Sequence, residues 1–337
     1  MTSREDKRQR RDAIISDMCQ SMVGQAPDKI GAPGGDSRDS MRAYFGEQSL
    51  IVSRRKQEQR ARLEALVLKA LNESSAPVPR LIAWRGQWLL QQDLGAQRLS
   101  EALDQAAEPE VGGILQQAVT SLVQCQRAGR EKGLHQHLVS LGEKRPWFDK
   151  LLARRHGVGE LLGIEAPELD EDALAHQLRL RNPHFLKWDA RPGNAIATGD
   201  GDVFWIDWEH CGCRNPLDDL VWLMADEYTP DNAAAEALIM STWLEPLSTG
   251  WDSGEAEDYF YTYAVLHSLV RLHYILRYRE DGPWWDYQCC VSHDKVGVTR
   301  AQALRQLRRM QRWVGNTSHL GGLESWLAQL EQALPVN

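Results

Sequence analysis

The stretch FLKWDARPGN, residues 185–194, places Asp189 five residues before Asn194, with a Pro-Gly pair between them. Thirteen residues after the asparagine, the apolar run VFWID ends in Asp207. Aspartate and asparagine are common in loops, and this spacing alone often arises by chance. Its place directly before a short strand, downstream of a strand-rich part and a helical part, favours a functional site over an ordinary polar loop.

The three side chains suit a site for a phosphoryl donor such as ATP together with Mg²⁺. Mg²⁺ prefers octahedral oxygen ligands and usually takes one or two carboxylates along with phosphate oxygens. Asp207 at the strand end is suited to bind the metal, and Asn194 offers a second, neutral oxygen. Asp189 is then the carboxylate that accepts or orients the proton of an attacking hydroxyl group.

The composition is that of a globular protein and argues against several classes. The 337 residues are 42% hydrophobic and 26% charged, enough for one large or two moderate domains. A formal net charge of −8 argues against a general nucleic-acid binder. We expect no membrane span, because no apolar run reaches ~20 residues, and the start MTSREDKRQRRD does not resemble a signal peptide. The six cysteines lack the spacing of a zinc site, so reduced thiols in a cytoplasmic protein are expected.

The first part of the chain, residues 1–95, predicts a small α+β unit. A helix is expected over residues 5–23, followed by a loop rich in Gly, Pro and Asp. Two strands, MRAYFGE and QSLIVSRR, then meet at Gly46, which suits a hairpin turn. A helix over residues 60–71 precedes two more strands, RLIAW and QWLLQQDLG.

The second part, residues 96–337, predicts a mainly helical unit. Helical spacing dominates, apart from the loop quoted above, the strand DVFWID and the segment EDGPWWDYQCCVSHDKVG. A cleft between a sheet-rich and a helical part is where a ligand is expected.

These motifs together resemble the aminoglycoside phosphotransferase and choline kinase families. Their loop H-G-D-x-x-P-G-N is matched at Asp189, Pro192, Gly193 and Asn194, and IDWE at residues 206–209 resembles their metal motif. NPLDDLVWL at 215–223 looks like the helix start that follows it. The resemblance implies an α+β, bilobal protein-kinase-like fold with a small antiparallel-sheet N-lobe and a larger helical C-lobe.

The resemblance extends to the small lobe and implies nucleotide-binding residues there. SMRAYF resembles the phosphate-covering hairpin, so Ser40 and Arg42 are expected at the phosphates. Glu64 matches the helix glutamate that pairs with a strand lysine in the family. LLQQDLG looks like the hinge that pairs with adenine, which brings Gln92 to the nucleotide.

Two departures from the family pattern stand out. The strand that carries the family lysine ends here in Ser53, Arg54 and Arg55. Because strand residues alternate between faces, Arg54 replaces the lysine beside Glu64 if it faces the cleft; otherwise the arginines are surface residues and phosphate binding comes from elsewhere. Lys187 stands where the family has histidine, and we expect it to face the acids Asp189 and Asp207 as a counter-charge.

Other polar and aromatic residues have weaker assignments. Asp219 is expected to brace the loop, Asp218 to lie on the surface, and Glu209 to contact either an acceptor or the protein itself. The pair Trp284 and Trp285 would line an acceptor pocket or, as paired tryptophans usually do, join the core.

The sequence thus predicts an ATP- and Mg²⁺-dependent phosphotransferase acting on a hydroxyl group of a small molecule, a sugar or amino sugar in the first place. Choline-like, amino-alcohol and aminoglycoside acceptors stay open. A nucleotide-binding pseudokinase scaffold is the alternative of another class, motivated by the missing strand lysine and loop histidine. A protein substrate is disfavoured, because no long activation segment follows Asp207.

Overall fold

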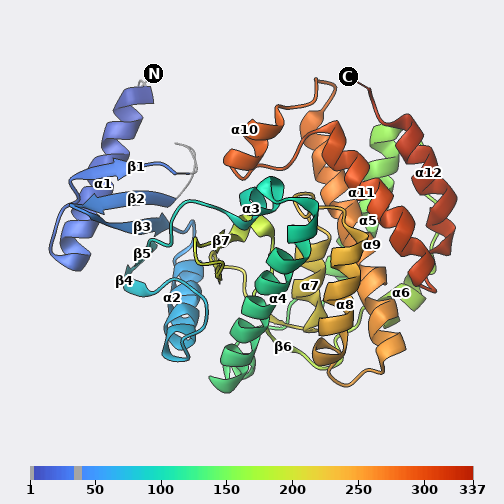
Figure 1. Cartoon of the computed structure of the whole chain (residues 1–337), viewed down its shortest axis with the longest axis horizontal. Coiled ribbons are helices and arrows are strands. Elements are labelled where there is room, and N and C mark those ends of the chain that lie inside the picture. Colours follow the sequence, from blue (N-terminus) through green and yellow to red (C-terminus); the bar gives the residue numbers. More distant parts are fainter. Residues whose placement is uncertain (1–3, 34–39, 337) are drawn as a thin grey trace.

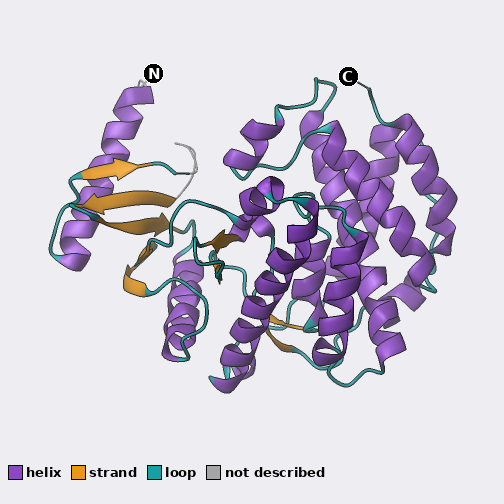
Figure 2. Cartoon of the chain, viewed as in Figure 1, coloured by secondary structure: helices purple, strands orange, loops and turns teal. Residues whose placement is uncertain are grey.

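The computed structural model describes residues 4–33 and 40–336. A small sheet with two helices lies beside a larger, mainly helical part (Figure 1). The N-terminus and the C-terminus lie on the same side of the molecule. Colouring by secondary structure makes the contrast between the two parts plain (Figure 2). This is the arrangement that the sequence predicts.

The small part is built on one antiparallel sheet with the strand order β1-β2-β3-β5-β4. Its strands are β1 (Lys29–Gly31), β2 (Ser40–Phe45), β3 (Gln48–Arg54), β4 (Leu81–Arg85) and β5 (Trp88–Gln92). Gly46 opens the two-residue turn between β2 and β3 with φ of 62°, as its position predicts. The short strand β1 lies in a segment predicted as loop, of which residues 34–39 fall outside the described chain.

Helices cover both faces of this sheet. Helix α1 (Arg4–Val23) packs Ile15 and Cys19 against Met41, Val52 and Leu90 on one face. On the other face, helix α2 (Glu58–Glu73) contributes a smaller apolar cluster that includes Leu89 of β5. Since successive residues of a strand point to opposite faces, Leu89 and Leu90 mark which side of the sheet each helix covers.

The large part holds ten helices of the described chain around one core. They are α3 (Leu99–Gln105), α4 (Glu108–Glu131), α5 (Arg145–Leu162), α6 (Glu171–Gln177), α7 (Leu217–Met224), α8 (Ala233–Leu247), α9 (Ser253–Arg279), α10 (Tyr287–Ser292), α11 (Arg300–Trp313) and α12 (Glu324–Ala333). Helix α9 packs against α5, α7, α8 and α11, so it forms the centre of this part. Helix α10 lies inside the segment that the sequence predicts as irregular.

Two short antiparallel strand pairs hold the two ends of the loop of residues 185–194. Strand β6 (His184–Leu186) pairs with β9 (Gly212–Arg214), and β7 (Ala195–Ala197) pairs with β8 (Val203–Trp205). Only β8 is predicted from the sequence, because three-residue strands carry too little periodicity to be recognised. The pairs bring the loop next to the segment that contains Asp207.

Among residues 4–33 and 40–336, no helix is long and apolar enough to cross a membrane. All six cysteines are free thiols, and only Cys289 is exposed. Burial raises the pKa of the thiols of Cys125 and Cys211 well above the usual range. These two cysteines are therefore unreactive thiols at neutral pH.

Candidate active site

The loop of residues 185–194 is held in an uncommon backbone conformation by the start of helix α7. Trp188 and Asp189 have left-handed φ angles of 53° and 62°. Residues other than glycine keep this conformation only where the surroundings fix it. Here the carboxylate of Asp219 accepts hydrogen bonds of 2.8 Å from the main-chain N–H groups of Lys187 and Trp188. The predicted brace by Asp219 is confirmed.

Lys187 is fully buried and connects this loop to Asp207. Its Nζ donates to the main-chain carbonyl of Asp207 at 2.9 Å and to that of Asp189 at 3.3 Å. Asp207 also has a left-handed φ of 62°. The lysine thus lies between the two aspartates, as expected, but it hydrogen-bonds their carbonyl groups and not their carboxylates.

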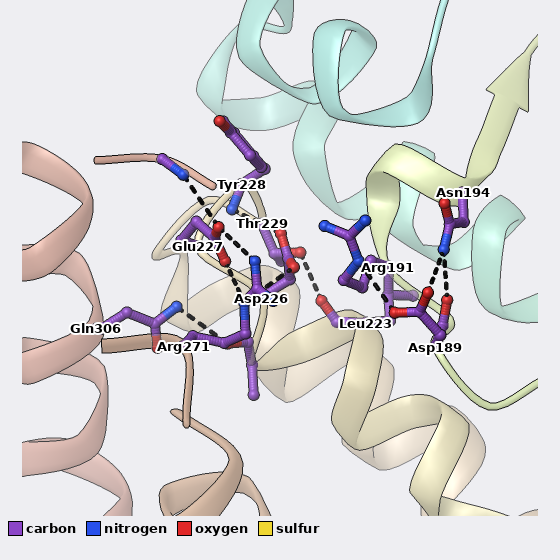
Figure 3. Close-up of polar contacts among 12 residues, drawn as sticks. Asp189, Arg191, Asn194, Leu223, Asp226, Glu227, Tyr228, Thr229, Arg271 and Gln306 are labelled. Atoms are coloured by element: carbon purple, nitrogen blue, oxygen red, sulfur yellow. Dashed lines mark hydrogen bonds and ion pairs between the residues drawn. The ribbon is translucent and has the colours of Figure 1, made fainter. Parts of the chain in front are cut away.

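The carboxylate of Asp189 is fixed at both of its oxygens (Figure 3). Asn194 donates from Nδ2 to Oδ2 at 2.8 Å, and to the main-chain carbonyl of Asp189 at 3.0 Å. Arg191 donates from Nε to Oδ1 at 3.1 Å. With a donor on each oxygen, the plane of the carboxylate is defined without any ligand.

Arg55 faces three carboxylates at the cleft side of the sheet. Its Nε and Nη2 donate to Glu64 at 2.6 and 2.8 Å, which is a buried, bidentate ion pair. Nη2 is also 2.9 Å from Oδ1 of Asp207, and Nη1 is 3.5 Å from Oε1 of Glu209. Burial acts to raise the pKa of Asp207, but Arg55 and then Lys187 outweigh it, so this pKa is lowered and the group is a carboxylate at neutral pH.

The arginine beside Glu64 is therefore Arg55, and the assignment of Arg54 is wrong. Arg54 is exposed and donates to Oε1 of Gln87 at 3.1 Å. The reason is the sheet register: Arg54 lies opposite Trp88, whereas Ser53 lies opposite Leu89, on the face that helix α2 covers. Arg55 follows Ser53 on that face, where Glu64 is located.

A cavity of about 850 Å³ lies between the sheet and the helical part, and residues from both parts line it. The predicted residues Ser40, Arg42, Gln92, Asn194 and Asp207 are all on its wall. The volume is in the range of small-molecule and cofactor sites. The structure thus brings together residues that lie up to 167 positions apart in the sequence.

Two of the lining residues of strand β2 already have protein partners. Arg42 pairs with Asp93, at 2.5 Å between Nε and Oδ2, and donates from Nη2 to the carbonyl of Gly95 at 2.9 Å. The hydroxyl of Ser40 shares a hydrogen bond of 2.9 Å with that of Ser53. The contacts of Arg42 attach the β2–β3 hairpin to the segment that follows β5, and the bond between Ser40 and Ser53 joins the two strands of the hairpin.

The donor set fits a magnesium ion bound together with phosphate. Asn194 uses its amide nitrogen on Asp189, and within residues 4–33 and 40–336 its Oδ1 accepts no hydrogen bond. Asp207 supplies a carboxylate on the same cavity wall, and the main-chain N–H of Ile206 donates to the carbonyl of Asn194 at 3.0 Å, which keeps the two segments together. One carboxylate and one neutral oxygen, completed by phosphate oxygens, is a usual Mg²⁺ arrangement.

The remaining predicted residues have mixed outcomes. Asp218 is not on the surface: it is fully buried, ion-paired with Arg214 and hydrogen-bonded by Tyr259. Trp284 packs against the main core, and Trp285 is exposed. Neither tryptophan lines the cavity described above.

Sequence reasoning missed an ionic cluster behind the loop. Its members are Asp226, Glu227, Arg271 and Asp294, which lie behind Arg191, and we call it the rear cluster. Asp226 and Glu227 directly follow the apolar helix α7 and its C-cap Ala225, which is the one local signal that these acids are buried. Their partner Arg271 comes 44 residues after Glu227, so nothing in the local sequence points to the pairing.

Three comparisons with known proteins bear on this site. A family model described as the phosphotransferase enzyme family matches residues 33–257. No curated protein matches the sequence. A putative aminoglycoside phosphotransferase from Ralstonia eutropha is similar in structure, with 15% identity, a TM-score of 0.52, and coverage of 88% of this chain and 97% of that one.

Two further solved structures share the fold. An aminoglycoside phosphotransferase from Alicyclobacillus acidocaldarius has 13% identity, a TM-score of 0.50, and coverage of 92% and 96%. A thermostable mutant of the aminoglycoside phosphotransferase APH(4)-Ia, solved with ADP and hygromycin B, has 13% identity, a TM-score of 0.52, and coverage of 91% and 99%. These likenesses confirm the kinase-like fold, and the family model spans most of the chain. The chain therefore belongs to the phosphotransferase enzyme family.

Proposed function

We propose that this phosphotransferase moves the terminal phosphoryl group of ATP to a hydroxyl group of a small molecule, a sugar or amino sugar in the first place. The observation that carries the proposal is the geometry around Asn194. Its side chain holds Asp189 on one side, and on the other it shares the wall of an 850 Å³ cavity with Asp207.

In this proposal the three residues divide the work. Asp189 accepts or orients the proton of the attacking hydroxyl group, because its carboxylate is fixed and partly exposed. Asn194 and Asp207 hold Mg²⁺. When bound, the metal supplies positive charge that neutralises phosphate oxygens.

Arg55 takes the place of the family's strand lysine. Its guanidinium is organised by Glu64 and reaches the cavity, so it is suited to bind phosphate oxygens. Ser40 and Arg42 cover the nucleotide from strand β2, and the segment that starts at Gln92 receives the base. With an arginine in this position, the missing lysine is no argument for a pseudokinase.

The acceptor is proposed from the hairpin SMRAYF, which resembles the sugar-kinase branch of the family. Choline, amino alcohols and aminoglycosides are the competing acceptors. We further propose that residues 1–95 and 96–337 act as separate lobes around the nucleotide, and that the enzyme works in the cytoplasm, where ATP is supplied.

The test is Mg²⁺-dependent ATP consumption by the purified chain with glucose, glucosamine, choline, ethanolamine and kanamycin. The Asp189→Asn variant is the control, because it keeps size and removes the charge. We expect turnover with a sugar or amino sugar, and a kcat lower by at least ~10² in the variant. Nucleotide binding without turnover by the wild-type chain would favour the scaffold function. Turnover with choline or kanamycin alone would replace the sugar acceptor by a choline-like or an aminoglycoside acceptor.

A further inference from the structure

The side chain of Arg191 lies between Asp189 on one side and the rear cluster on the other (Figure 3). Its Nε donates to Oδ1 of Asp189, and only 15% of its side chain is exposed. Its Nη2 lies 3.8 Å from Oδ2 of Asp294. Burial acts to lower the pKa of Arg191, but Asp189, Asp294, Asp226 and Glu227 outweigh it and raise that pKa, so the guanidinium keeps its charge.

The acids behind Arg191 are rigidly held. Glu227 accepts both Nε and Nη2 of Arg271 at 2.6 Å, and the main-chain N–H of Gly297 at 3.2 Å. Asp226 is fully buried, accepts the N–H of Tyr228 at 3.0 Å with Oδ1, and has Oδ2 3.7 Å from Nε of Arg271. Burial, followed by Glu227, raises the pKa of Asp226 to about 7, whereas Arg271 outweighs burial and lowers that of Glu227, so Glu227 supplies the lasting negative charge against which a cation can be positioned.

The main chain of this segment is held as well. Arg309 donates to the carbonyl of Asp226 at 3.1 Å, and Arg305 donates to that of Glu227 at 2.9 Å. Gln306 donates to the carbonyl of Ala225 at 3.0 Å. Because helix α11 supplies all three donors, Asp226 and Glu227 cannot shift without breaking these hydrogen bonds.

We propose that Arg191 is a positioning residue for the transfer reaction: the rear cluster anchors its guanidinium, and its Nε fixes the plane of the Asp189 carboxylate toward the acceptor hydroxyl. This inference rests on the proposed function. Asn194 holds the other oxygen of Asp189, but Asn194 is also assigned to the metal. Arg191 is thus the support of Asp189 that does not depend on the metal.

The consequence is a defect in turnover and not in nucleotide binding. Without Arg191, the bond from Asn194 is the one hydrogen bond to the Asp189 carboxylate that remains among residues 4–33 and 40–336, so the carboxylate can rotate away from the acceptor. Misplacement of a reacting group by about 1 Å can cost about 10²-fold in rate. Arg191 does not line the cavity, so affinity for Mg·ATP should stay close to that of the wild type.

The experiment compares Arg191→Met, Arg191→Lys and Asp226→Asn with the wild type, using Mg·ATP and the best acceptor of the panel named above. We expect kcat to fall by about 10²-fold in Arg191→Met with KM for Mg·ATP unchanged, and to recover in part in Arg191→Lys, which restores the charge. Asp226→Asn should lower kcat in the wild-type background and have no further effect in Arg191→Met.

Arg155→Met is the matched control. Arg155 is also buried, with 1% of its side chain exposed, but it donates to Leu152 and Glu171, within α5 and at the start of α6. This variant should lose stability and keep kcat. A second readout needs no turnover: unfolding free energies of Arg191→Met, Asp189→Asn and the double variant should be non-additive without nucleotide.

The outcomes separate the two proposals. A wild-type chain that consumes no ATP with any acceptor overturns the proposed function, and this inference with it. An active wild type whose Arg191→Met variant keeps its kcat overturns the inference alone, as do additive unfolding free energies. If Arg191→Met does not fold, Arg191→Lys and Asp226→Asn decide by the same readout. A lower kcat with unchanged KM for Mg·ATP supports the inference, and an unchanged kcat overturns it.

Discussion

The 185–194 loop and the end of strand β3 both depart from the family pattern, but they are held in different ways. The loop is supported within the helical part, where Asp219 accepts from its main chain and its own buried Lys187 donates to the carbonyl of Asp207. The strand end reaches across the cleft, because Arg55 contacts Glu64 in its own part and Asp207 in the other. The loop is thus organised before any ligand arrives, whereas the Arg55 contact depends on how the two parts meet.

The largest effect on stability is expected at Arg55. Arg55→Met leaves the fully buried Glu64 without its cation, and breaking a buried ion pair in this way typically costs about 3–5 kcal/mol. Urea unfolding measures the loss. Arg54→Met is the matched control, because Arg54 is exposed and should change stability by no more than about 0.5 kcal/mol. Equal losses in the two variants would contradict the register of strand β3.

The second effect concerns Lys187, in the loop. Lys187→Met keeps most of the side-chain stem but removes the donor to two partly buried carbonyl groups, which should cost about 2 kcal/mol. From the sequence alone, a counter-charge role predicts a larger loss without Mg·ATP than with it. The carbonyl contacts change this expectation: the losses should be nearly equal, because the metal cannot replace a donor to the main chain.

Melting temperatures with and without Mg·ATP decide between the two roles of Lys187. A markedly larger loss in the nucleotide-free protein would restore the counter-charge role, which the lowered pKa of Asp207 supports in part. Equal losses would mean that this lysine replaces the family histidine as a structural donor.

The third effect depends on pH and lies beneath the loop. His267 is buried against Trp222, which in turn contacts Trp188, and burial followed by Arg271 lowers the pKa of His267 to about 3. Below a pH of about 6.5, the pKa of a histidine in the unfolded chain, His267 binds a proton in the unfolded state but stays neutral in the native state. Stability should therefore fall by about 2 kcal/mol from this group alone between pH 6.5 and pH 5.

The His267→Phe variant keeps a ring beside Trp222 and should lack this contribution. Urea unfolding at pH 7 and pH 5 measures it, as the difference in pH dependence between wild type and variant. His210→Asn serves as control, because His210 is exposed. An unchanged pH dependence in His267→Phe would assign the acid sensitivity to other groups.

The same two regions explain what the sequence could and could not predict. The hairpin, helix α2 and strands β4 and β5 follow from their periodicity and from Gly46, and Asp189, Asn194 and Asp207 follow from the family motifs. Alternation along β3 separates Arg54 from Arg55, but it cannot say which face meets α2, because that depends on the packing of α1 on the other face.

The supports of the loop were harder to predict for a related reason. Asp226 and Glu227 meet Arg271 and Arg191 only through tertiary packing, and two acids that follow an apolar helix carry no signal of their partners. The sequence predicts Lys187 near Asp189 and Asp207, since next-but-one residues in an extended segment share a side. Its contacts to carbonyl groups depend on the left-handed backbone of Asp189 and Asp207, which no local sequence pattern predicts.

The smallest effect is expected at Gly46, and it contrasts the turn of the hairpin with the loop. Gly46→Ala meets no atom within 4 Å, so it should cost only the strain of its left-handed backbone, about 1 kcal/mol, with kcat unchanged. At Gly193 an added Cβ would lie 1.9 Å from Oδ1 of Asp294, so Gly193→Ala must displace a member of the rear cluster. It should therefore lower kcat as well as stability. Paired unfolding and turnover measurements test this, and a Gly193→Ala variant with normal kcat would show that the loop does not depend on the cluster behind it.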